Sequence, residues 1–167
     1  PASGIKAACR ALKPGGQAIF FEPFNGWSIL RLAFERILAE AALRGDPLEP
    51  SLDVAVRQLI EDVAARSPES YSPALALKDD KWLFSRTGVE AMARNAGFAT
   101  VRFVPHNDHP SLYRDVAASH LRLSVGHDDL RFPAWAGAIL DSFDAALTLN
   151  AKREFMVEGT IVLGKAA

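Results

Sequence analysis

The sequence predicts an α/β fold, in which three short strands are separated by amphipathic helices. Apolar runs typical of strands occur at about residues 17–22, 99–104 and 154–163, and helical periodicity fills most of the chain between them. With 167 residues, of which 49% are hydrophobic, the chain is long enough to bury one ordinary core. Residues 1–167 are therefore expected to form a single domain.

The first strand follows a sharp corner in the chain. Pro14 cannot continue the preceding helix, and Gly15 and Gly16 allow the backbone to reverse. The run from Gln17 to Glu22 is apolar at both odd and even positions. Because a half-exposed strand would alternate, this pattern predicts an interior strand that is covered on both faces.

The helices are marked by periodicity and by their capping residues. Residues 27–43 carry a regular apolar stripe, and Ser51 is expected to cap the next helix. A shorter helix at about 86–96 has Ser85 as its expected N-cap and Gly97 as its left-handed C-cap.

Composition and charge exclude several classes of protein. The 19 basic and 20 acidic side chains give a formal net charge of −1, without the basic surface expected of a nucleic-acid-binding protein. Apolar runs are all shorter than the roughly 20 residues of a membrane span. A single cysteine, Cys9, fits a reducing compartment. We therefore expect a cytoplasmic protein with neither nucleic acid nor membrane as a partner.

Three segments, taken in order, resemble one family. The stretch ALKPGGQAIFFEP at 11–23 is similar to the helix, turn and fifth strand of class I S-adenosylmethionine-dependent methyltransferases. The stretch WLFSRTGVEAMARNAGF at 82–98 resembles the next helix of that family, which often ends in Ala-Gly-Phe. The later strands would then be the sixth and seventh. The resemblance implies a partial Rossmann-like sheet of order 5-7-6 with an antiparallel last strand.

The resemblance covers only the second half of that family's fold. In the family, S-adenosylmethionine is held mainly by the first half of the fold, through a Gly-rich turn after strand one, an acidic residue that ends strand two, and residues after strand four. No comparable turn follows a strand in this sequence. The resemblance therefore implies that S-adenosylmethionine is the cofactor of the complete protein. This chain alone is expected to be inactive, and no residue of it is assigned to cofactor binding.

Topology suggests where an acceptor would bind. If the strands at 17–22 and 99–104 are parallel, their C-terminal ends share the edge where open α/β sheets bind ligands. Helical inserts at about 24–80 and 107–152 leave from this edge and would form a lid over a small-molecule acceptor. The candidate substrate-binding residues are Glu22, Phe24, Asn25, Trp27, Trp82, Phe84 and Asp108.

His106 and His109 are the candidate catalytic residues. With Asp108 between them, they have the composition of a general base and its orienting carboxylate. A metal site is not expected, because no further ligands lie at suitable spacing. Other interpretations remain open: Asp108 as a helix cap beside solvated histidines, Glu22 as a cap of the following turn, and the aromatic residues as ordinary core.

The strand at 17–22 also suggests a partner. Without a neighbour on its outer side it would leave an apolar, unpaired edge, which favours a homodimer or a swapped assembly through this strand.

Two other functions stay open beside methyl transfer. One is a non-catalytic dimerisation or partner-binding module related to methyltransferases, and the other is a small-ligand binding domain of unrelated α+β fold.

Overall fold

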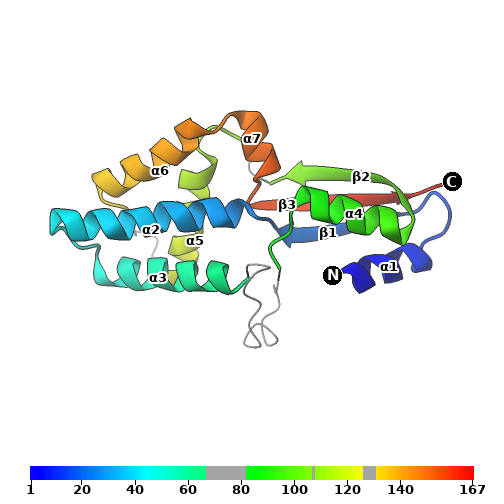
Figure 1. The fold of residues 1–167 in the computed structure, drawn as a ribbon, viewed down its shortest axis with the longest axis horizontal. Coiled ribbons are helices and arrows are strands. Elements are labelled where there is room, and N and C mark those ends of the chain that lie inside the picture. Colours follow the sequence, from blue (N-terminus) through cyan, green and yellow to red (C-terminus); the bar gives the residue numbers. More distant parts are fainter. Residues whose placement is uncertain (67–81, 107, 126–130) are drawn as a thin grey trace.

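The chain forms a small sheet with a group of helices at one end of it (Figure 1). The computed structural model describes residues 1–66, 82–106, 108–125 and 131–167. The elements are α1 (Ala2–Ala11), β1 (Gln17–Pro23), α2 (Gly26–Arg44), α3 (Pro50–Ala65), α4 (Arg86–Ala96), β2 (Phe98–Pro105), α5 (Leu112–Val125), α6 (Ala134–Ala146), α7 (Leu149–Glu154) and β3 (Glu158–Lys165).

The sheet has the order β1-β3-β2, and β3 is antiparallel to both of its neighbours. Ile161 at its centre is in register with Phe20 on one side and with Phe103 on the other. It follows that β1 and β2 run in the same direction and that their C-terminal ends lie at one edge. The expected mixed α/β fold is confirmed at this level.

One face of the sheet is covered by α1 and α4, which pack against each other. The Lys165 ammonium, at the end of β3, donates to the carbonyls of Cys9 and Leu12 and so satisfies the C-terminal end of α1. The core beneath these helices consists of Ile5, Cys9, Phe24, Val89, Ala93, Phe98, Met156, Ile161 and Leu163.

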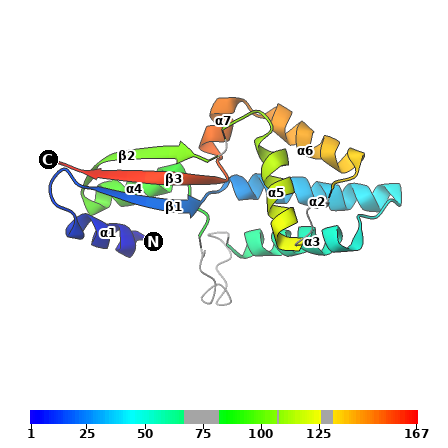
Figure 2. The same cartoon turned by 180° about the vertical axis from the view of Figure 1, so that it is seen from behind.

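The opposite face of the sheet, which we call the open face, carries no helix in Figure 2. Ile19 is 58% exposed and Phe21 71% exposed, and Val104 of β2 is also exposed. The prediction that residues 17–22 are covered on both faces is therefore wrong for this chain. Both helices that flank the strands pack on the same side, so alternate residues of β1 remain in water.

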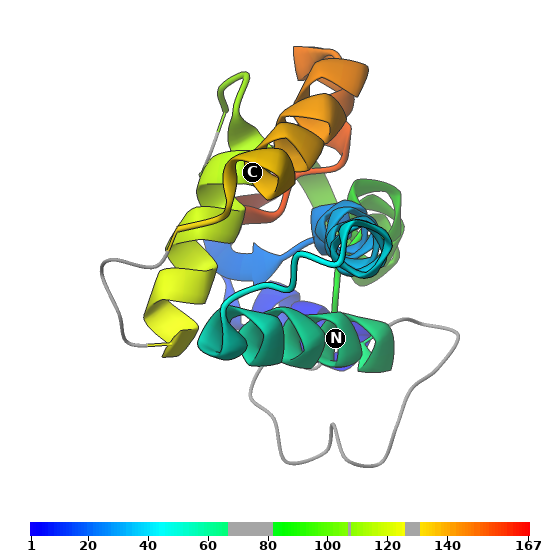
Figure 3. The same cartoon turned by 90° about the vertical axis from the view of Figure 1, so that its left-hand side faces the viewer.

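The predicted helical inserts form a layer of their own, built from α2, α3, α5 and α6, which Figure 3 shows viewed along the axis of α2. Parts of both inserts, at 67–81, 107 and 126–130, lie outside the described residues. None of the described helices has the length and apolarity needed to cross a membrane. The core of the layer includes Trp27, Leu30, Phe34, Ile37, Leu52, Val56, Leu59, Leu112, Tyr113, Val116, Leu121 and Leu140.

A buried ion pair joins α5 and α6 of this layer to α7. The Asp144 carboxylate accepts hydrogen bonds from the backbone N–H groups of Tyr113 (3.1 Å) and Arg114 (3.0 Å), and so caps α5. Lys152 donates to the same carboxylate at 2.8 Å and to the carbonyl of Pro110. Burial raises the pKa of the neighbouring Tyr113 phenol to about 12. Each charge of the pair is thus compensated inside the protein.

The start of one helix and the start of one strand differ from the expectations. Glu49 rather than Ser51 caps α3, because its carboxylate accepts from the N–H groups of Ser51 and Leu52. The third strand begins at Glu158 rather than at about residue 154, since Thr148 caps an additional helix, α7, with a hydrogen bond from Ala151. The caps at Ser85 and Gly97 are as predicted.

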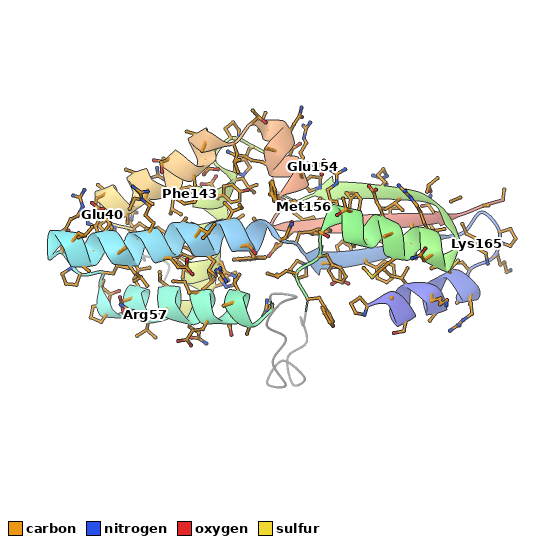
Figure 4. All side chains as sticks on the ribbon, in the orientation of Figure 1. Glu40, Arg57, Phe143, Glu154, Met156 and Lys165 are labelled. Carbon is orange, nitrogen blue, oxygen red and sulfur yellow. The ribbon has the colours of Figure 1, made fainter. Side chains whose placement is uncertain are left out.

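The sheet and the helical layer meet at a tight junction, where Met156 is almost fully buried (Figure 4). The N–H of Gly26, at the start of α2, donates to the Met156 carbonyl at 3.0 Å. A Cβ atom at Gly26 would overlap the carbonyl oxygens of Phe155 and Met156. A residue without a side chain is therefore required for α2 to leave β1 at this point.

Candidate functional site

A pocket of about 180 Å³ lies at the edge where β1 and β2 end. Glu22 and Pro23 of β1 line one side of it, and His106, which follows β2, lines another. Glu158 lies between them because β3, running the other way, begins at this edge. The structure thus brings together two of the predicted site residues, Glu22 and His106, which are distant in the sequence.

Contacts with β3 hold His106 in place. Its backbone N–H donates to the carbonyl of Glu158 at 3.1 Å, and its Nε2 atom lies 3.0 Å from the Thr160 hydroxyl oxygen. The ring centroid is 6.1 Å from that of Phe21, which also lines the pocket. The imidazole is therefore oriented over the end of the open face.

Glu158 is a lining residue that the sequence analysis missed. The third strand was expected to begin four residues earlier, which placed this residue inside a strand rather than at its end. Within the described part of the chain, its carboxylate forms no hydrogen bond or ion pair. The Glu158 charge raises the pKa of His120 on α5, but burial of the imidazole lowers this pKa by more.

A second pocket, also of about 180 Å³, lies on the helix-covered side of β1. Phe84, a predicted site residue, lines it together with Phe20 and Ile161. Phe84 is held by backbone hydrogen bonds to Pro23 and Asn25, in an isolated parallel bridge beside the end of β1. Glu22 contributes to this pocket as well as to the first, so it lies between the two.

The expected arrangement of Asp108 between two histidines is not observed. Asp108 instead accepts a bidentate pair of hydrogen bonds from Arg153, at 2.9 and 3.1 Å. These bonds hold the pKa of the Asp108 carboxyl below its usual value. His109 lies 3.6 Å from Asp115 of α5. Neither Asp108 nor His109 lines a described pocket, and Asp108 does not cap α5, because Asp144 does.

Two of the aromatic candidates belong to the core. Phe24 is 0% exposed and packs beneath the sheet, and Trp27 packs in the helical layer at 4.8 Å from the ring of His120. Neither side chain lines a described pocket, and their burial favours the alternative that they are ordinary core, because the chain turns inward immediately after Pro23. Trp82 is partly exposed and lines neither described pocket. The Asn25 side-chain oxygen is buried without a hydrogen-bond partner among the described residues.

The described residues do not complete a site for a nucleotide-like cofactor. Pockets that enclose a ligand of that size measure roughly 300–1,000 Å³, well above the volume at this edge. No two glycines of the sequence occur at Gly-x-Gly spacing. Within the described residues, no group of three or more His, Cys, Asp or Glu side chains is arranged to hold a metal ion.

Comparisons of the chain with models of protein families, with curated proteins and with solved structures found no match. A function for the chain is therefore inferred from the geometry of the edge and from the segments of resemblance.

Proposed function

We propose that this chain is the C-terminal half of an S-adenosylmethionine-dependent methyltransferase and that it contributes the acceptor side of the active site. The observation that carries the proposal is the sheet: order β1-β3-β2, with an antiparallel last strand. This is the order implied for strands five, seven and six by the segments at 11–23 and 82–98.

Three further features support the proposal. Helices α1 and α4 pack on the same side of the sheet, so the open face is available to elements of another half. The helical layer lies at the C-terminal ends of β1 and β2, where open α/β sheets bind ligands. A free and buried Cys9 fits the cytoplasmic location that we propose for the enzyme.

The residues of the edge would hold the acceptor and receive its proton. S-adenosylmethionine, when bound, supplies the methyl group. The His106 ring, oriented by Thr160, lies beside the pocket and can accept a proton from an acceptor oxygen or nitrogen. Glu22 would orient the acceptor from the opposite wall, since positioning alone accounts for much of the rate of such transfers.

The decisive experiment compares this chain alone with the product of the whole gene, including whatever is encoded before Pro1. Calorimetry with S-adenosylmethionine should show binding to the longer protein and none to residues 1–167. A longer protein that binds no S-adenosylmethionine would contradict the proposal. Replacement of His106 by Gln should lower kcat for an identified acceptor by about 10²–10⁴-fold, the usual contribution of a general base.

A second candidate, an association module, is favoured by the exposed side chains of the open face. Ile19 and Phe21 lie next to each other on β1, an edge strand of the sheet. Exposed edges of this kind pair readily with other chains. We propose that residues 1–167 form a homodimer or a swapped assembly through β1, which sedimentation at tens of micromolar would test. A monodisperse monomer would contradict it.

A further inference from the structure

We propose that the pocket between α1 and β1 binds a small uncharged aromatic molecule, with about the size of a substituted benzene ring. This is the second of the two pockets described above, and it lies on the helix-covered side of β1. Among its described lining residues, Glu22 is the one with a charged side chain, and it lies at the boundary with the other pocket. The inference goes beyond the proposed function and does not rest on it.

Two walls of the pocket belong to the core beneath the sheet. Phe20 and Ile161 lie opposite each other in the β1–β3 pairing, so both side chains project from the helix-covered face. Ile161 is 2% exposed, and Ile5 of α1, which also lines the pocket, is 6% exposed. A charged ligand would lose its hydration against these walls, whereas an uncharged ring would leave water for an apolar surface.

Phe84 forms a wall that is held in place by the backbone. Its N–H donates to the carbonyl of Pro23 at 3.0 Å, and its carbonyl accepts from the N–H of Asn25 at 2.9 Å. Its ring lies tilted at 57° to that of the buried Phe24, with the centroids 6.4 Å apart. A ligand ring beside Phe84 and Phe20 can make the offset or edge-to-face contacts that aromatic pairs favour. Because this wall is already ordered, binding costs little conformational entropy there.

The exposed side of the pocket contains a glycine that the backbone does not require. A Cβ atom at Gly4 would meet no atom within 4 Å, and Gly4 does not have a positive φ angle. Glycine is nevertheless a poor residue for a helix such as α1. Its effect at this position is to leave space beside Ile5, on the side from which a ligand would enter.

The volume of the pocket corresponds to a single ring. It measures about 180 Å³, slightly more than an engineered apolar cavity of about 150 Å³ that binds benzene. Sites for drug-sized ligands measure roughly 300–1,000 Å³. One benzene ring with a small substituent therefore fits the pocket, and a nucleoside does not.

The test follows the isoleucine methyl groups of residues 1–167 by NMR, at neutral pH, during titration with toluene or with benzoate. Toluene should shift the signals of Ile5 and Ile161 saturably, with a Kd on the order of 1 mM or lower. The signal of Ile19, which lies on the open face, should not change. Benzoate is similar in size but charged, and it should bind at least about tenfold more weakly than toluene.

Two leucine variants locate the site. Gly4→Leu adds a side chain to a residue that lines the pocket, and it should weaken the binding of toluene at least about tenfold. Ala7→Leu adds the same side chain at an exposed position of α1 outside the lining, so it is the matched control and should leave the affinity unchanged. Circular dichroism shows whether both variants keep the helical content of the unaltered chain.

Four results would overturn the inference. They are no saturable shift of Ile5 and Ile161, an equal shift of Ile19, equal affinity for toluene and benzoate, and equal affinity for toluene in the two leucine variants. The comparison of the two probes uses the unaltered chain and so does not depend on the folding of a variant. Because no S-adenosylmethionine is present, this experiment can fail or succeed independently of the methyltransferase proposal.

Discussion

The helical layer and the sheet bury their apolar residues to very different extents. In the helical layer, Leu30, Phe34 and Ile37 of α2 are fully buried. In the sheet, Ile19 and Phe21 of β1 are more than half exposed. Among the described residues, the helices share one buried core, whereas helices cover the strands on one side only. The uncovered side of β1 agrees with our proposal that another element packs on the sheet.

The two regions also treat charge differently. The Asp144–Lys152 pair, which links the helical layer to α7, is buried and satisfied by hydrogen bonds within the protein. At the end of the sheet, Glu158 faces an open pocket. Removing either member of the buried pair would leave an uncompensated charge inside the protein, whereas Glu158 is exposed to solvent.

The largest expected effect on stability comes from removing one partner of the buried ion pair. Asp144→Ala should lower the free energy of unfolding by about 3–5 kcal/mol, because it leaves the Lys152 charge buried without its partner. Asp141→Ala, on the same helix, removes an exposed ion pair with Arg114 and should cost only about 0–1 kcal/mol. Urea denaturation measures both variants, and equal losses would show that the buried pair is not a main element of stability.

The next largest loss of stability is expected for a substitution at the junction between the two regions. Gly26→Ala is expected to cost about 1–3 kcal/mol, because its Cβ would force α2 away from the carbonyls of Phe155 and Met156. Gly4→Ala in α1 meets no atom within 4 Å and should be neutral or slightly stabilising. Thermal unfolding of the two variants compares them, and a stable Gly26→Ala protein would contradict the close packing described here.

A smaller effect on stability is expected on the open face. Phe21→Ser should change the free energy of unfolding by less than about 1 kcal/mol, because the side chain is mostly in water. The same variant should shift the protein toward monomer if β1 mediates association. Sedimentation velocity gives the second quantity, and an unchanged oligomer would place the contact elsewhere.

The smallest effect concerns pH. Burial lowers the pKa of His120, which contacts Trp27, so the folded state holds this imidazole neutral more strongly than the unfolded state does. The unfolded chain then binds more protons, and stability contributed by neutral His120 should be lost as pH falls below about 6.5. Urea midpoints at pH 7.5 and 5.5 should differ less in His120→Gln, and an identical difference would assign the pH dependence to other groups.

Local signals predicted the boundaries that depend on a few neighbouring residues. Ser85 and Gly97 cap α4 as expected, because each acts on backbone groups within four positions of itself. The predicted cap at Ser51 was wrong, since the helix begins earlier, at Pro50, and the Glu49 carboxylate accepts from the N–H groups of Ser51 and Leu52. The predicted start of the third strand at about residue 154 was also wrong, because Thr148 caps the short helix α7, which occupies 149–154.

The amino-acid sequence by itself determined the three strands, most of the helices and the presence of Glu22 and His106 at the ends of β1 and β2. These features follow from periodicity and from local capping, which act over one or two turns of chain. Only the tertiary structure decided that Phe24 and Trp27 are core, that Asp108 binds Arg153, and that Glu158 joins the pocket. Those outcomes depend on contacts between residues distant in the chain, because the direction of each strand and the face covered by each helix are set by packing.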